Sequence, residues 1–168
     1  TLSIEFMPIP HSTPMAMLIV LHTPKGVIIY GNDFKLDNSP TLGPKTDFKR
    51  LKELSDEGVL ALIIDSLYAN EEMKTPSEFV AKEMLKDVLL SVENKNNLIV
   101  VTTFASHIAR LKETIEFGRK LNREIVILGR SMNKYITAAE NIKLVNFTKE
   151  AELIKYPDQV RKKLKEIQ

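Results

Sequence analysis

A histidine between two prolines and an aspartate close to a glycine are the residues of this chain whose types and positions could bind a metal ion. His11 stands in Pro10-His11-Ser12-Thr13-Pro14, and Asp33 stands further along in Gly31-Asn32-Asp33-Phe34-Lys35. Each lies where an apolar segment ends, and the flanking prolines would stiffen the backbone and so fix the direction of the His11 ring. Both residues also have an ordinary structural interpretation, as a histidine in a turn and an aspartate in an Asx-turn.

These two residues do not complete a metal site. A catalytic zinc ion normally has three protein ligands and an open position for water. Cysteine is absent and the only histidines are His11, His22 and His107, so neither a thiolate cage nor a multi-histidine site can be built here. If His11 and Asp33 bind metal, other ligands must come from outside the 168 residues, and we interpret the chain as part of an enzyme.

Further candidate residues follow predicted strands. Asp65 ends the apolar run 59–64, which predicts a buried strand, and a buried carboxylate must find a partner. It could orient a histidine ligand, act as acid and base, or cap the following loop. Ser106, Arg130 and Ser131 lie in segments that open predicted helices, where free backbone N–H groups attract anions. The Arg130 guanidinium beside Ser131 suits bidentate phosphate binding.

Strands and helices must hold these residues in place. The first third of the chain contains three strand-like segments separated by Pro and Gly turns: 2–6, 15–21 and 27–30. Phe48, Leu51 and Leu54 then recur at helical spacing before the strand 59–64. Another helix begins at the capping sequence 75–78. Apolar runs at 98–101 and 124–128, each followed by a helix, predict a parallel sheet with right-handed crossovers.

Composition excludes some classes of protein. The apolar fraction of 43% and charged fraction of 27% are ordinary for a soluble globular protein. No apolar run approaches the roughly 20 residues that cross a bilayer, and no signal segment opens the chain, so we predict a cytoplasmic protein that does not enter a membrane. A net charge of +2 is too small to indicate nucleic-acid binding by itself. Because the chain starts with Thr1 in a strand-like segment, we expect a trimmed or excerpted product.

The histidine and aspartate segments resemble those of the ribonuclease J group of the metallo-β-lactamase superfamily, in which a β-CASP domain interrupts the metallo-β-lactamase fold. Residues 10–14 are similar to the segment that carries the family's isolated metal-ligand histidine. Residues 22–26 and 33–35 look like the hairpin and the bridging aspartate that follow it. The family usually has Thr-Gly-Asp where this chain has Gly31-Asn32-Asp33.

The middle of the chain resembles the β-CASP domain of the same group. Asp65-Ser66 with Ala69-Asn70 and Thr75-Pro76-Ser77-Glu78 look like its acidic motif and the helix behind it. Thr103-Phe104-Ala105-Ser106 and Gly129-Arg130-Ser131-Met132 are similar to two of its loops. The His-x-His-x-Asp-His segment that carries most metal ligands of the family is absent, as are its later histidine motifs.

The resemblance implies a ribonuclease that depends on a divalent metal and hydrolyses RNA phosphodiester bonds with a metal-held water, as a 5′ exonuclease, an endonuclease or both. Two zinc ions are implied, and manganese is compatible with the ligands. His11 and Asp33 would be metal ligands, and Asp65 and Asp33 catalytic carboxylates. Ser106, Arg130 and Ser131 would contact RNA. A homodimer of the whole enzyme is compatible with the resemblance, and this chain alone is expected to be inactive.

The expected fold is α/β. Residues 1–66 would be the C-terminal part of a metallo-β-lactamase half, and residues 67–168 the first part of a parallel-sheet β-CASP domain. The alternative function is a stand-alone α/β module that binds nucleotides or RNA without catalysis. Zinc or manganese should perturb His11 in the first case, whereas phosphate should perturb Ser106 and Arg130 in the second. A purely structural or dimerising piece predicts neither response.

Overall fold

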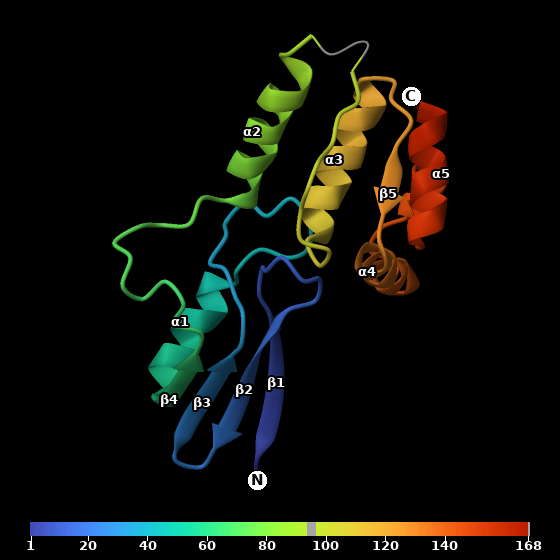
Figure 1. The fold of residues 1–168 in the computed structure, drawn as a ribbon. Helices are drawn as coiled ribbons and strands as arrows, with labels where there is room; N and C mark the ends of the chain where they lie inside the picture. Colours follow the sequence, from blue (N-terminus) through green and yellow to red (C-terminus); the bar gives the residue numbers. More distant parts are fainter. Residues whose placement is uncertain (94–96, 168) are drawn as a thin grey trace. The chain divides into compact units, whose positions relative to one another are not determined.

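The computed structural model describes residues 1–93 and 97–167, and the chain forms two compact units, Thr1–Val80 and Ala81–Gln168 (Figure 1). The fold is mixed α/β, as predicted from the sequence, and each unit has its own sheet. The division after Val80 reflects compactness. The boundary predicted between residues 66 and 67 separates two family domains and not two compact units, and it stays a prediction.

Unit 1 is built on a four-stranded sheet with the spatial order β1-β2-β3-β4. Its elements are β1 (Ser3–Pro8), β2 (Met17–Thr23), β3 (Gly26–Gly31), α1 (Phe48–Glu57) and β4 (Val59–Ile64). The first three strands pair antiparallel, whereas β4 pairs parallel to β3 after the chain has passed through α1. The strand-like segments predicted in the first third of the chain and the helix before Asp65 are therefore confirmed.

One face of this sheet packs on α1 and the other carries exposed apolar side chains. Leu18, Val20 and Ile29 are buried together with Leu54 of α1, which is 0% exposed. On the opposite face, cross-strand partners such as Phe6 and Ile19 are exposed, because their side chains alternate with the buried ones along each strand. The open sheet face consists of Ile4, Phe6, Met17, Ile19, Tyr30 and Ile63.

The prediction that β4 is a buried strand is wrong for this chain. Leu60 is 58% exposed, Leu62 is 57% exposed and Ile63 is 54% exposed. The physical reason is position: β4 is an edge strand that pairs with β3 alone among the described strands, so most of its surface is left uncovered. A continuous apolar run is typical of a strand that is covered on both faces. Among the described residues, no further strand pairs with the outer edge of β4.

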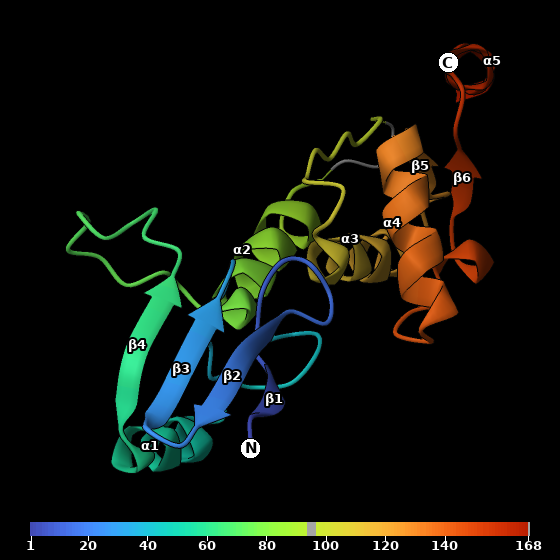
Figure 2. The ribbon, with the colours of Figure 1, turned by 90° about the horizontal axis from the view of Figure 1, so that it is seen from below.

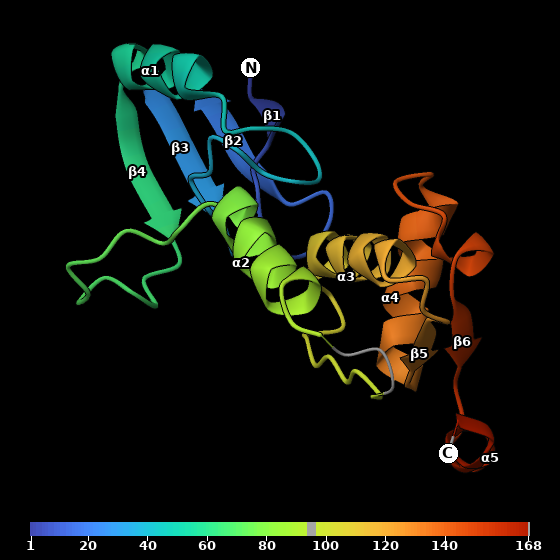
Figure 3. The same ribbon diagram turned by 90° about the horizontal axis from the view of Figure 1, so that it is seen from above.

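Unit 2 contains most of the helices. Its elements are α2 (Glu78–Leu90, which starts in unit 1), α3 (Ile108–Lys120), β5 (Val126–Leu128), α4 (Arg130–Asn141), the 3-10 helix η1 (Phe147–Lys149), β6 (Glu152–Ile154) and α5 (Pro157–Ile167). β5 and β6 pair parallel, and α4 connects them and contacts both strands (Figures 2 and 3). Ile108, Ile115 and Phe117 of α3 are buried in this unit. In the described part of the chain, no helix is both long and apolar enough to span a membrane.

The apolar run 98–101 does not form the buried strand that its sequence predicts. It belongs to neither sheet, and Leu98 and Val100 are 61% and 76% exposed. The second predicted strand of this region is confirmed but shorter, as Val126–Leu128. The apolar residues favour a strand at 98–101, but a strand also needs a backbone partner, and β5 pairs with β6 alone among the described strands.

Candidate functional site

His11 lies in a closed loop between β1 and β2. The Ile9 N–H donates to the Ala16 carbonyl across 3.0 Å and closes the loop at its base. The His11 side chain is half-buried, and its Nδ1 accepts a long hydrogen bond of 3.5 Å from the Thr13 N–H. The prediction that the prolines fix the direction of the ring for metal binding stays a prediction.

Asp33 lies in the loop that leaves the end of β3. Its side chain is exposed and makes no hydrogen bond or ion pair among the described contacts. Two residues later, the Lys35 N–H donates to the carbonyl of Pro10 across 2.8 Å. This backbone hydrogen bond holds the two segments that carry the predicted ligands next to each other. The assignment of His11 and Asp33 as ligands stays a prediction.

The described side chains do not by themselves form a metal centre. Among residues 1–93 and 97–167, no three His, Cys, Asp or Glu side chains are grouped closely enough to hold a metal ion. His11 and Asp33 supply at most one nitrogen donor and one carboxylate, and a catalytic zinc ion normally needs three protein ligands. The donor set of this chain alone therefore does not fit a catalytic zinc ion.

Asp65 follows β4 and is exposed, so the expectation of a buried carboxylate is wrong. The reason is the uncovered position of β4 itself. Asp65 Oδ1 accepts a hydrogen bond of 3.2 Å from the N–H of Leu67, which is the local turn expected under the capping interpretation. Its role as an acid, a base or a partner of a histidine ligand stays a prediction.

Asp37 is a buried polar residue that the sequence analysis did not single out. Its carboxylate accepts hydrogen bonds from the Ser77 hydroxyl (2.7 Å), the Glu78 N–H (2.8 Å) and the Ser39 N–H (2.8 Å). The capping sequence 75–78 predicts that Thr75 caps the next helix and that Pro76 is its first residue. In the structure, α2 begins at Glu78, and the hydroxyl of Ser77 accepts from the Phe79 N–H at 3.2 Å. The Glu78 N–H donates to Asp37, which lies in a loop 41 residues earlier. No local sequence pattern contains such a long-range partner.

The environment of Asp37 favours its charged form. Burial alone would raise the pKa of this carboxyl group, but the hydrogen bonds from Glu78, Ser77 and Ser39 and the charge of Lys35 outweigh burial and lower the pKa. Lys35 Nζ lies 3.7 Å from Asp37 Oδ2 and 3.6 Å from Glu78 Oε2. Asp37 is therefore an anion held in place by backbone, hydroxyl and ammonium groups.

The three residues predicted to contact RNA lie in unit 2. Ser106 is half-buried just before α3, whose first turn is capped by His107: its Nδ1 accepts from the Arg110 N–H at 3.4 Å. Arg130 and Ser131 are exposed in the first turn of α4, which has no side-chain cap. None of the described contacts joins Ser106 to Arg130 or Ser131.

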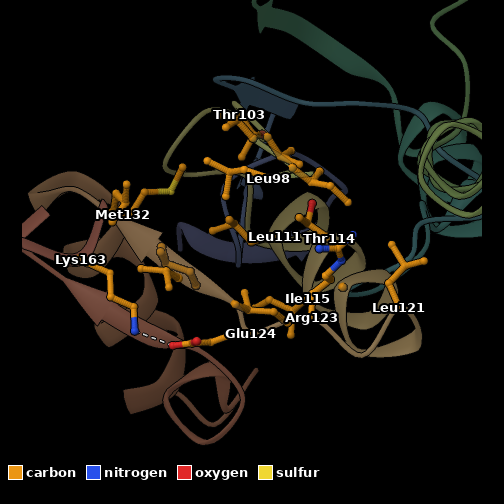
Figure 4. A pocket seen from close by; sticks show the side chains of 18 of the residues that line it. Leu98, Thr103, Leu111, Thr114, Ile115, Leu121, Arg123, Glu124, Met132 and Lys163 are labelled. Carbon is orange, nitrogen blue, oxygen red and sulfur yellow. Dashed lines mark hydrogen bonds and ion pairs between the residues drawn. The ribbon is translucent and has the colours of Figure 1, made fainter. Parts of the chain in front are cut away.

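Unit 2 also contains a mainly apolar cavity of about 280 Å³ (Figure 4). Leu98, Leu111 and Ile115 line it, and Lys163 forms ion pairs at its edge with Glu124 and Glu152. Its lining includes Met132 but not Ser106, Arg130 or Ser131. The cavity therefore borders the two predicted segments at Thr103 and Met132, whereas the three residues predicted to contact RNA do not line it.

Comparison with known protein families matches residues 96–167 to the family described as "Ribonuclease J, beta-CASP domain". Among characterised proteins, the chain is 45% identical to "Ribonuclease J" of Pyrococcus abyssi over 166 residues, which are 99% of this chain and 37% of that protein. It is 42% identical to "Ribonuclease J" of Methanocaldococcus jannaschii with the same coverage of both. "Ribonuclease J" of Sinorhizobium meliloti is 34% identical over 88% of this chain and 26% of that protein.

These matches cover the loops of His11, Asp33 and Asp65 as well as the helices of unit 2. The chain spans little more than a third of the length of the two archaeal relatives, 37% in each case. Residues 96–167 match a β-CASP domain, and ribonuclease J proteins match 99% of the chain. The chain therefore belongs to the ribonuclease J family.

Proposed function

We propose that this chain is part of a ribonuclease that depends on a divalent metal and hydrolyses RNA phosphodiester bonds with a metal-held water. The relatives are named as ribonucleases, which supports RNA as the substrate. The whole protein would act in the cytoplasm as a 5′ exonuclease, an endonuclease or both, and its metal would be zinc, as two ions, or manganese. Residues before the β-CASP domain would belong to a metallo-β-lactamase half.

One observation carries the metal part of this proposal. The hydrogen bond between the Lys35 N–H and the Pro10 carbonyl, 2.8 Å long, fastens the Asp33 loop to the His11 loop. A half-buried imidazole and an exposed carboxylate without a described partner are thereby carried on adjoining backbone segments. These are the donor types that zinc and manganese accept.

The proposed roles follow from chemistry and exposure. His11 would donate a ring nitrogen and Asp33 its carboxylate to the metal, with the remaining ligands outside the 168 residues. Asp65 would orient a ligand or carry a proton. Because affinity grows with the number of preformed ligands, this chain alone would bind metal weakly and leave RNA uncut.

Arg130, Ser131 and Ser106 would contact the RNA backbone. The exposed guanidinium of Arg130 can bind phosphate in a bidentate manner, and the first turn of α4 leaves backbone N–H groups without a side-chain cap. Such contacts position the strand and carry no base specificity.

The metal proposal can be tested on the 168-residue chain by NMR titration with Mn²⁺. We expect paramagnetic broadening of the His11 and Asp33 amide signals at the same metal concentrations, because one ion would lie near both. Asp33→Asn should abolish the shared broadening. Asp56→Asn, which neutralises an exposed carboxylate of α1 in the same unit, should leave it unchanged. The proposal would be contradicted if Mn²⁺ left the His11 amide signal sharp, or if the shared broadening were still present in Asp33→Asn.

The proposed activity needs a second assay, because ligand binding is not catalysis. The longer protein that contains these residues should cleave a 5′-phosphorylated RNA and should lose this activity in a chelator. The 168-residue chain should not cleave the same RNA with zinc or manganese present. Metal-dependent cleavage by the short chain would show that the ligand set is complete within it, against the proposal.

A further inference from the structure

The loop that carries Asp33 is fastened to two other loops of unit 1. On one side, the Lys35 N–H donates to the Pro10 carbonyl, next to His11. On the other side, Asp37 is 2% exposed and contacts the start of α2, where the loop that follows Asp65 ends. Three chain segments that carry predicted catalytic residues thus meet through Lys35 and Asp37.

The Asp37 carboxylate connects these segments with both of its oxygens. Oδ1 accepts from the Ser77 hydroxyl at 2.7 Å and from the Ser39 N–H at 2.8 Å, and Oδ2 accepts from the Glu78 N–H at 2.8 Å. Hydrogen bonds to a charged group are stronger than neutral ones, and burial shields them from competition by water. This arrangement is more extensive than a helix cap needs, because a cap requires only the contact with the helix N–H.

Lys35 transmits the constraint within the loop. Its backbone N–H holds the loop of His11, while its Nζ lies 3.7 Å from Asp37 and 3.6 Å from the Glu78 carboxylate. A shift of Asp37 would therefore release the Lys35 side chain as well. Since Asp33 lies two residues before Lys35, its backbone would lose the same support.

We propose that Asp37 is a positioning residue: it holds the Asp33 loop against the loop of His11 and against the segment that follows Asp65, through Lys35 and Ser77. Its value for catalysis rests on the function proposed above, because it acts on the predicted ligands. The constraint itself is a property of unit 1 that exists without metal.

Hydrogen exchange of the metal-free 168-residue chain tests the constraint. Asp37→Asn should speed exchange of the Glu78 N–H and of the Lys35 N–H by about tenfold each, as expected for loss of a hydrogen-bonded charge. Asp47→Asn is the matched control, because Asp47 Oδ1 caps α1 by accepting from the Arg50 N–H at 2.9 Å. It should leave Lys35 unchanged. Faster exchange at Glu78 alone would overturn the proposal and leave Asp37 with no role beyond accepting from the first N–H of α2.

A second variant covers the case in which Asp37→Asn unfolds unit 1 as a whole. Ser77→Ala keeps the Asp37 charge and removes one donor of Oδ1. Faster exchange at Lys35, with the core amide of Val20 still protected, would support the proposal. Unchanged exchange at Lys35 in this variant would overturn it.

A spectroscopic readout separates positioning from the metal proposal. In the unmodified 168-residue chain, Mn²⁺ should broaden the amide signals of His11 and Asp33 together. In Ser77→Ala, which stays folded, the shared broadening should be weaker by about threefold or more. Absence of any broadening in the unmodified chain would remove the metal proposal and leave the exchange test of Asp37 standing. Shared broadening that is as strong in Ser77→Ala as in the unmodified chain would overturn the positioning role.

Discussion

Glu5 of β1 is paired with two cationic or basic side chains from other elements. Arg50 of α1 donates to both of its carboxylate oxygens, at 2.9 and 2.7 Å, and the His22 ring of β2 lies 3.0 Å away. Arg50 and His22 also contact Glu57, at 3.0 and 3.2 Å. The cluster therefore joins β1, β2 and the two ends of α1. The hydrogen bonds from Arg50, against the opposing effect of burial and with help from His22, lower the pKa of Glu5 to about 2.

This pKa makes the stability of unit 1 depend on acidity. Because the folded pKa of Glu5 lies below its ordinary value of 4.5, the stabilisation is complete above pH 4.5 and is lost as the pH falls toward 2. Glu5→Gln should lower the free energy of unfolding at pH 7 by about 1 kcal/mol, since solvent screens a partly exposed pair. Urea unfolding at pH 7 and pH 2.5 measures this, and most of the difference between the variant and the unmodified chain should disappear at the lower pH.

An exposed glutamate provides the control for the pH experiment. Glu72 lies in the loop between β4 and α2 and has no described partner, so Glu72→Gln should change the unfolding free energy by less than about 0.5 kcal/mol at both pH values. A Glu5→Gln deficit that stays constant down to pH 2.5 would contradict the assigned cause, because it would not depend on the carboxylate charge.

Single residues also show what the sequence could and could not predict about the candidate site. His11 and Asp33 are candidates that the sequence alone provides, because residue type, proline neighbours and the ends of apolar segments are local properties, and their role as ligands stays a prediction. Asp37 was not, because its partners Ser77 and Glu78 lie 40 and 41 residues away and come close only after folding. Asp65 was located at a strand end as predicted, but its exposure depends on neighbours that no local pattern contains.

At the scale of elements, the packing of α1 on the sheet determines the core of unit 1. Leu54 is 0% exposed, so Leu54→Ala should lower the free energy of unfolding by about 2–5 kcal/mol through lost burial and a remaining cavity. Ile63 of β4 is 54% exposed, and Ile63→Ala should cost less than about 1 kcal/mol. Urea unfolding of both variants measures the difference. Equal losses would show that β4 is buried in solution, contrary to the structure.

The helices and strands of unit 1 were easier to predict from the sequence than the strand with which each strand pairs. Apolar spacing predicts α1. Proline and glycine turns separate the three predicted strands that form β1, β2 and β3, and residues 22–26 predict the hairpin between β2 and β3. The runs 59–64 and 98–101 have similar composition, yet the first forms an edge strand and the second forms none. The difference is backbone pairing: residues of β3 are available to β4, whereas the only partner of β5 in the described chain is β6. A run of apolar residues does not specify its neighbour.

At the scale of the whole molecule, the chain leaves much apolar surface in contact with water. Its accessible surface is 11756 Å². Two separate compact proteins of half its mass would together expose only about 10,000 Å². The open sheet face of unit 1 contributes to this surface, with Phe6 62% and Ile4 59% exposed. Contiguous apolar patches of this kind are uncommon on monomeric proteins of ordinary stability.

The open sheet face should bind an apolar fluorescent dye such as ANS although the protein is folded. Phe6→Ser should reduce the dye fluorescence by about half, because Phe6 is the most exposed member of the cross-strand row that continues through Ile19, Tyr30 and Ile63. Leu67→Ser is the matched control: Leu67 is 74% exposed but lies in a loop, away from the cross-strand rows, and should leave the fluorescence nearly unchanged. Far-UV circular dichroism establishes that both variants stay folded. Equal fluorescence losses in the two variants would show that the dye responds to scattered apolar side chains, since only a continuous surface makes the position of the substitution matter.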